Sequence, residues 1–221
     1  MDILEAMQLR HSVRSYLEKP LENGVKSALQ EEINKINRES GLHIQLVVNE
    51  PKAFNSLMAH YGKFSGVTNY IALVGRKSPD LDELCGYYGE RLALLAQRLG
   101  LNTCWVAMTY KKIPGVFQAA PQEKLTMVIA LGYGATQGVP HKSKPVEAVA
   151  AGYAAAPEWF QRGVDAALLA PTAMNQQKFT LTLEGGAVLA KAGAGFYTKT
   201  DLGIVKYHFE AAAGKENLRW A

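Results

Sequence analysis

Two stretches that lie far apart in the chain follow the same plan. Residues 82–96 and 201–213 each open with an acidic residue and continue as an amphipathic helix. Each then leads through a glycine to a segment that ends at a tryptophan, Trp105 in the first case and Trp220 in the second. A repeat of this kind predicts two related structural halves in one chain. The alternative is that two unrelated helices happen to precede a tryptophan.

The hydrophobic pattern predicts alternating helices and strands. Helices are expected at 3–9, 21–37, 80–99, 157–169 and 201–213, and strands at 43–49, 69–75, 102–108, 125–132, 179–184 and 187–192. The Gly185–Gly186 pair indicates a tight turn between the last two strands. Such a hairpin implies antiparallel pairing, so the expected fold class is α+β.

Composition limits the class of protein and the kinds of site. A chain of 221 residues that is 48% hydrophobic can bury a sound core and is not disordered. Cys85 and Cys104 lie in apolar contexts, which favours two buried thiols over a disulfide framework. The five histidines show no metal-ligand spacing, so we predict no metal site.

Charge and hydropathy argue against two classes of partner. The formal net charge is only +4, and the lysine pairs lack the interleaved aromatic residues of a nucleic-acid surface. No apolar run approaches the length that spans a bilayer, and the first residues do not resemble a signal peptide. We therefore expect no nucleic-acid or membrane partner, and a cytoplasmic location.

The sequence shows no nucleophile with its base. Ser12 is next to His11, but neighbouring side chains on extended backbone point in opposite directions. We therefore predict no catalytic residue of the chain's own. This favours an enzyme whose cofactor carries the difficult step.

Two polar segments carry the chemistry of ligand binding. Residues 10–14, Arg-His-Ser-Val-Arg, supply two guanidiniums, which bind phosphate with two hydrogen bonds each. Residues 170–177, Ala-Pro-Thr-Ala-Met-Asn-Gln-Gln, supply amides that match the edge of a heteroaromatic ring. Together they could hold both ends of a phosphorylated flavin. Taken singly, the first is also explained as a basic helix end and the second as a polar loop.

These segments resemble motifs of the FMN-dependent nitroreductase family. Arg-His-Ser-Val-Arg-Ser-Tyr at 10–16 is similar to the opening motif, and 170–177 is similar to the family's Ala-Pro-Ser-Ala-x-Asn-x-Gln segment. Residues 101–106, 130–133 and 142–145 also match family segments in order. The resemblance touches most of the chain, and it implies a nitroreductase-like fold with FMN as the cofactor.

The order of the motifs departs from the usual family pattern. In the family, the Pro-Ser-x-x-Asn segment comes a few tens of residues after the opening motif and reaches into the partner subunit's flavin site. Here it follows residues 142–144. The resemblance therefore implies a monomer of the single-chain, Thermotoga type: a pseudo-dimer whose halves, 1–150 and 151–221, mimic the family homodimer. Antiparallel or mixed sheets flanked by helices are expected.

The resemblance also implies a set of cofactor-binding residues. They are Arg10, His11, Ser12, Arg14, Ala107, Met108, Thr109, Lys142, Lys144, Pro171, Thr172, Ala173, Met174, Asn175 and Gln177. Arg10, Ser12 and Arg14 would hold the phosphate, the ribityl chain and one ring edge. Lys142 and Lys144 would close over the phosphate, and Asn175 would meet the ring. The backbone of residues 107–109 would face flavin N5, where the Met108 side chain narrows the access of substrate.

The implied activity is a two-step reduction. NADH or NADPH would reduce the FMN, which would then reduce a nitroaromatic, a quinone or a similar small-molecule acceptor in ping-pong turnover. Two alternatives remain open. One is a non-catalytic FMN-binding or sensor module, and the other is a different flavin reaction on the same scaffold, such as flavin fragmentation or dehalogenation. The sequence does not choose between NADH and NADPH.

Overall fold

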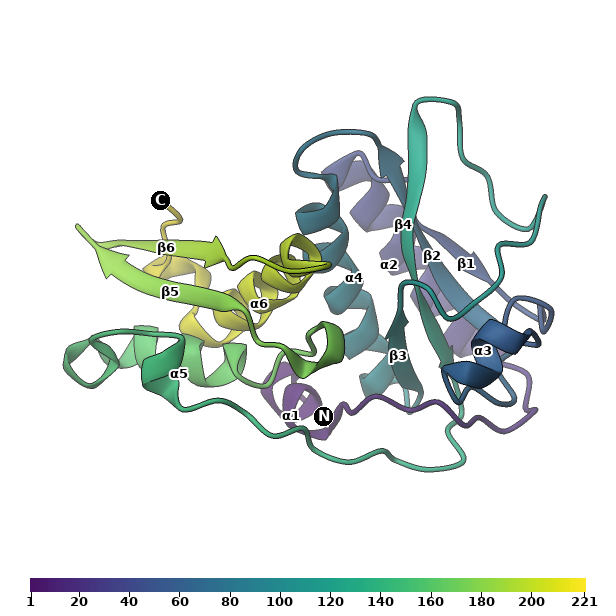
Figure 1. Cartoon of the computed structure of the whole chain (residues 1–221), viewed down its shortest axis with the longest axis horizontal. Helices are drawn as coiled ribbons and strands as arrows, with labels where there is room; N and C mark the ends of the chain where they lie inside the picture. Colours follow the sequence, from purple (N-terminus) through teal and green to yellow (C-terminus); the bar gives the residue numbers. More distant parts are fainter. The chain divides into compact units, whose positions relative to one another are not determined.

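Figure 1 shows the computed structural model, which describes all 221 residues. The chain forms two compact units, and each is assembled from separate stretches of sequence. Unit 1 contains residues 1–9, 82–91 and 140–221, and unit 2 contains residues 10–81 and 92–139. This division follows packing, whereas the predicted halves at 1–150 and 151–221 follow the repeat, and those halves remain a prediction.

Unit 2 is built on a four-stranded antiparallel sheet in the order β1-β2-β4-β3. The strands are β1 (Gln45–Val47), β2 (Asn69–Arg76), β3 (Asn102–Val106) and β4 (Glu123–Gly132). Every residue of β2 except Arg76 is buried, which explains its continuous apolar run. On β4, Ala130 pairs with Tyr70 on one side and Cys104 on the other.

Helices accompany this sheet within unit 2. They are α2 (Asn23–Ser40), the five-residue α3 (Leu57–Tyr61) and the C-terminal part of α4 (Leu81–Arg98). Leu29, Ile33 and Ile36 of α2 are fully buried at helical spacing, as the pattern predicts. Gly41 caps the C-terminus of α2. Its φ of 70° lies in the left-handed region, which glycine adopts without steric cost.

An aromatic cluster occupies the core of unit 2. The Phe54 ring centroid lies 5.1 Å from that of Phe64, 5.9 Å from that of Tyr70 and 6.1 Å from that of Tyr110. Three of these rings come from loops, and only Tyr70 lies on a strand. Their packing therefore fixes the loops around residues 54–64 and the segment after β3 against the sheet.

Unit 1 combines helices with a single hairpin. Its elements are α1 (Ile3–Leu9), α5 (Glu158–Ala167), α6 (Thr198–Ala213), β5 (Phe179–Glu184) and β6 (Ala187–Ala192), with 3-10 turns at Val146–Ala148, Tyr153–Ala155, Ala173–Asn175 and Lys215–Asn217. The predicted hairpin is confirmed, and Figure 1 shows its two antiparallel arrows. Gly185 and Gly186 both have positive φ, as a two-residue turn of this kind requires.

The two helices of the proposed repeat meet closely inside unit 1, where residues 82–91 of α4 pack on α6. A Cβ atom added to Gly86 would collide with the carbonyl oxygen of Thr200, and one added to Gly203 would collide with that of Glu83. Only glycine permits this approach of the two backbones. Polar contacts border it, since the Tyr87 hydroxyl donates to Glu210 at 2.8 Å and Lys206 pairs with Glu83.

The fold class is α+β, as predicted, with antiparallel sheets and flanking helices. Both cysteine thiols are buried, which confirms the reading of Cys85 and Cys104. None of the helices combines the length and apolarity needed to cross a membrane.

Candidate functional site

The opening motif forms an extended segment beside the edge strand β3. Ser12 bridges Thr103 in parallel, and the Val13 N–H donates to the Thr103 carbonyl at 3.0 Å. Val13 is buried in the core at 1% exposure, whereas Ser12 and Arg14 are exposed. The alternation of extended backbone thus places Val13 on the core side and leaves Ser12 and Arg14 exposed.

Arg10, Ser12 and Arg14 all influence the thiol of Cys104 on β3. Burial raises the pKa of the Cys104 thiol, and the Arg14 and Arg10 guanidiniums and a hydrogen bond with Ser12 partly offset that rise. Arg14 is exposed and lies 5.9 Å from the centroid of the Phe64 ring, whereas Arg10 is buried. Two guanidiniums and a hydroxyl on one short extended segment are a donor set of the kind that binds a phosphate group, so these residues suit FMN.

The segment expected to face flavin N5 follows β3 directly. Met108 is 64% exposed there, and Ala107 and Thr109 are partly buried. Thr109 packs against the end of α3, because a Cβ atom added to Gly62 would lie only 2.7 Å from the Thr109 Cβ. His11 lies beside another loop, since a Cβ atom on Gly138 would lie 2.8 Å from the His11 Cβ.

In unit 1, the structure joins the two remaining predicted motifs through Gln177. This residue is 3% exposed, and its amide oxygen accepts from the Lys144 N–H at 2.9 Å. Its amide nitrogen donates to the Lys142 carbonyl at 2.9 Å and to the Asn175 side-chain oxygen at 2.8 Å. The Lys144 ammonium donates to the Gln177 carbonyl at 2.9 Å. The lysine segment and the asparagine segment therefore form one hydrogen-bonded cluster.

These contacts separate the two predicted phosphate lysines. The Lys144 ammonium is held by a backbone carbonyl, while the Lys142 side chain is exposed and makes no hydrogen bond or ion pair. The Asn175 amide donates to the Lys142 carbonyl at 2.9 Å, so it acts within the cluster. Met174 is 94% exposed, and the Thr172 hydroxyl accepts from the Gln177 N–H at 3.0 Å. Lys142 is thus the better candidate for phosphate contact.

Two buried acidic residues of unit 1 lie outside the motifs of the sequence. Asp201 is 4% exposed, and its oxygens accept from the Ala173 N–H at 2.9 Å and the Gln176 amide at 2.7 Å. Burial raises the pKa of Asp201 to about 6, against the effect of these hydrogen bonds. Glu90 is fully buried and pairs with His208 at 3.0 Å. The sequence marks Asp201 only as the start of a helix, and nothing in it links Glu90 to His208.

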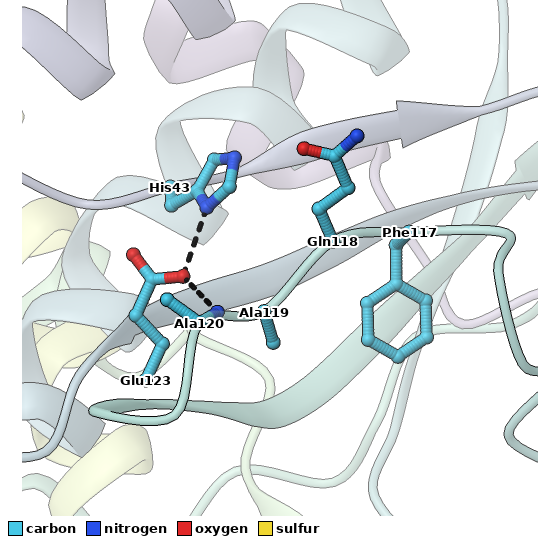
Figure 2. Close-up of a pocket in the computed structure, with 6 residues that line it drawn as sticks. All are labelled: His43, Phe117, Gln118, Ala119, Ala120 and Glu123. Atoms are coloured by element: carbon cyan, nitrogen blue, oxygen red, sulfur yellow. Dashed lines mark hydrogen bonds and ion pairs between the residues drawn. The ribbon is translucent and has the colours of Figure 1, made fainter.

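An open pocket of about 520 Å³ lies elsewhere in unit 2 (Figure 2). His43 Nδ1 lies 3.0 Å from the Glu123 carboxylate, which also accepts from the Ala120 N–H at 2.9 Å. The Gln45 amide binds both backbone groups of Gln118 nearby. Within this pocket no nucleophile accompanies the imidazole, and none of the predicted flavin residues lines it. Its contacts pin the loop before β4 to the segment around β1.

The Glu123 contacts predict a stability that depends on pH. Hydrogen bonds from His43 and Ala120 lower the pKa of Glu123 below its usual value of 4.5. Their contribution to stability is therefore complete above pH 4.5 and is lost as the pH falls through the lowered pKa. We expect Glu123→Gln to lower the thermal midpoint at pH 7, and we expect this deficit to shrink as the pH falls towards 3. The exposed Glu18→Gln variant is the control, and an equal deficit at both pH values would contradict the assignment.

Comparison with known protein families gives one match that covers most of the chain. A family model described as "Putative TM nitroreductase" matches residues 2–213. A search of curated proteins returned no match.

Solved structures share the fold. A putative nitroreductase from Thermotoga maritima superposes with a TM-score of 0.70 at 24% identity, over 96% of this chain and 83% of its own. A putative nitroreductase from Desulfovibrio desulfuricans, solved in complex with FMN, gives a TM-score of 0.53 at 16% identity, over 67% of this chain and 95% of its own. A nitroreductase family protein from Streptococcus pneumoniae gives 0.53 at 15% identity, over 67% of this chain and 98% of its own.

Proposed function

Because this chain belongs to the Putative TM nitroreductase family, we propose that it is an FMN-dependent oxidoreductase. The observation that carries the proposal is the extended segment of residues 10–14 beside β3. Its Arg10, Ser12 and Arg14 supply two guanidiniums and a hydroxyl, a donor set of the kind that binds phosphate. The FMN complex of the Desulfovibrio desulfuricans protein supports the choice of cofactor. The proposed setting is the cytoplasm, and the proposed partners are small molecules only.

In the proposed site, the chain binds and orients while the cofactor does the redox chemistry. When bound, FMN would supply the redox chemistry: uptake of a hydride from NADH or NADPH, and then reduction of a nitroaromatic, a quinone or a similar acceptor. Arg10, Ser12 and Arg14 bind the phosphate and ribityl end, and Lys142 adds a further positive charge. The segment around Asn175 and the backbone of residues 107–109 orient the ring.

The test is flavin binding followed by reduction. FMN is added to the purified protein, and the bound flavin is recovered and identified by chromatography. Recovery of FAD, or of no flavin at all, would overturn the proposal. NADH or NADPH is then added under anaerobic conditions. Rapid bleaching of the yellow colour supports an enzyme, and a stable yellow complex indicates a binding module without turnover.

Arg14 gives a first quantitative prediction. A hydrogen bond to a charged partner contributes about 1.5–3 kcal/mol, so Arg14→Ala should raise the dissociation constant for FMN roughly 10- to 150-fold. Lys111→Ala removes an exposed lysine of the same unit and should leave the constant unchanged. Flavin fluorescence titration measures both. Equal weakening in the two variants would show that the binding residues have been misassigned.

The number of motifs predicts a monomer. Residues 10–14 and 171–177 each occur once per chain, so one chain carries one copy of every proposed binding segment. We expect light scattering to report about 24.1 kDa with one FMN per chain. Mixing Arg14→Ala with Asn175→Ala should restore no binding. Restored binding in the mixture would indicate a dimer that exchanges these segments, while leaving the cofactor assignment intact.

A further inference from the structure

The segment Thr172–Gln177 has an unfavourable backbone conformation that needs support from contacts outside it. Met174, Asn175 and Gln177 have φ values of 51°, 54° and 44°. This left-handed region is sterically unfavourable for residues other than glycine, and here three of four successive residues occupy it. Such strain persists only where surrounding contacts over-determine the conformation. The contacts that do so are therefore part of any site to which the segment contributes.

Asp201 makes two of these contacts, one with Ala173 just before the strained residues and one with Gln176 among them. Its Oδ1 accepts from the Ala173 N–H at 2.9 Å, and its Oδ2 accepts from the Gln176 side-chain amide at 2.7 Å. The same amide of Gln176 donates to the Phe196 carbonyl at 2.9 Å. A single carboxylate thus binds two points of the segment, and Gln176 in turn binds the loop that leads into α6.

Both carboxylate oxygens are committed to this loop. Asp201 lies in the first turn of α6, where an acidic residue favours the helix dipole. A side chain that served only the helix would stay near solvent or accept from the first N–H groups of that helix. Asp201 is instead 4% exposed, and its hydrogen bonds join α6 to a segment more than 20 residues earlier.

Packing leaves the Gln176 amide little freedom. A Cβ atom added to Gly195 would lie 2.9 Å from the Gln176 Oε1. On the other side of the segment, Gln177 is held by the backbone of Lys142 and Lys144. The strained segment is therefore held by two sets of contacts. Asp201 binds Ala173 and Gln176, and the backbone of Lys142 and Lys144 binds Gln177.

We propose that Asp201 is a positioning residue that holds the Thr172–Gln177 segment in the conformation that binds FMN. This inference takes its ligand from the proposed function. The hydrogen bonds by which Asp201 holds the segment do not depend on that function. Asp201 touches no cofactor in this assignment, and it acts through Ala173 and Gln176.

The experiment has two readouts on the same set of variants. Hydrogen exchange followed by mass spectrometry reports the protection of residues 171–178 without FMN, and titration with FMN reports affinity. The variants are Asp201→Ala, Asp201→Asn and Gln176→Ala. Asp165→Asn is the matched control, because Asp165 is an exposed carboxylate of unit 1 that accepts from the Tyr153 hydroxyl.

We expect Asp201→Ala to speed exchange in residues 171–178 and to raise the FMN dissociation constant about tenfold or more. Asp201→Asn keeps one acceptor oxygen, so its exchange rates and its FMN dissociation constant should lie between those of Asp201→Ala and the wild type. Both quantities in Gln176→Ala should lie between those of Asp201→Asn and the wild type. The visible circular dichroism of FMN bound at saturation should also change in Asp201→Ala, because a displaced segment alters the surroundings of the ring. Asp165→Asn should match the wild type in every readout.

The outcomes separate this inference from the proposed function. If the wild type binds FMN and Asp201→Ala binds it equally well with unchanged dichroism, the inference is overturned and the function stands. Unchanged exchange in Asp201→Ala overturns the grip on the segment. If the wild type takes up no FMN, the proposed function and the flavin part of this inference both fail, while the exchange rates still decide the grip.

Discussion

The His208→Ala variant should lose about 3–5 kcal/mol of unfolding free energy. His208 and Glu90 are both fully buried, and His208 Nε2 lies 3.0 Å from the Glu90 carboxylate. His208 Nδ1 lies 3.0 Å from the Ala166 carbonyl, so that nitrogen carries a proton and donates it. Removing the imidazole deprives the buried Glu90 carboxyl group of this hydrogen-bond partner.

Urea unfolding at pH 7 measures this loss. His60→Ala is the control, because His60 is exposed on α3. Replacing both buried partners by leucine should cost less than the two single substitutions together, since no polar group of the pair is then left behind. The Ala166 carbonyl retains the Leu169 N–H at 3.0 Å in that variant. A loss below about 1 kcal/mol in His208→Ala would contradict the role of this pair.

Gly203→Ala is expected to cost about 3 kcal/mol, the upper end of the range for added core atoms. The new Cβ would overlap the Glu83 carbonyl oxygen and lie 2.7 Å from the Tyr87 nitrogen. Both obstacles are backbone atoms of α4, so no side chain can turn aside, and the helices must separate. Gly86→Ala should behave alike, because its Cβ would meet the Thr200 carbonyl oxygen.

A matched glycine gives the opposite sign. Gly24 lies inside α2, and a Cβ atom there would meet nothing within 4 Å. Gly24→Ala should therefore raise the unfolding free energy by up to about 1 kcal/mol, since alanine favours the helix. The same urea titration compares the variants. If Gly203→Ala were as stable as the wild type, the close approach of α4 and α6 would have to be wrong.

Elements defined by local signals were predictable from the sequence. Strands 179–184 and 187–192 were predicted to the residue, because alternation and a Gly-Gly turn fix both ends of each. Helix α3 escaped, because Leu57, Met58 and Tyr61 are exposed and give no amphipathic pattern. Helix α6 begins at Thr198, three residues before the expected start, where buried contacts of Thr198 and Thr200 extend it.

The candidate site divides in the same way. The segments with ligand-binding chemistry could be identified from the sequence, because guanidinium and amide groups are known from the residue type alone. It could not reveal that Lys144 and Gln177, 33 residues apart, bind each other, nor that Asp201 holds Gln176 from 25 residues away. Hydrogen bonds at such separations depend on the tertiary fold, and burial of an acidic residue leaves no mark in one sequence. The roles of the individual site residues therefore remain predictions.

The interrupted makeup of the two units sets an order of events during synthesis. Unit 2 is complete once residue 139 has emerged from the ribosome, whereas α1 and residues 82–91 belong with residues that emerge only afterwards. At about 5–20 residues per second, residues 140–221 take roughly 4–16 s to translate. Until then no α6 covers the part of α4 around Gly86. A nascent chain of this protein therefore presents an uncovered stretch of helix to chaperones for several seconds, although unit 2 can already be folded.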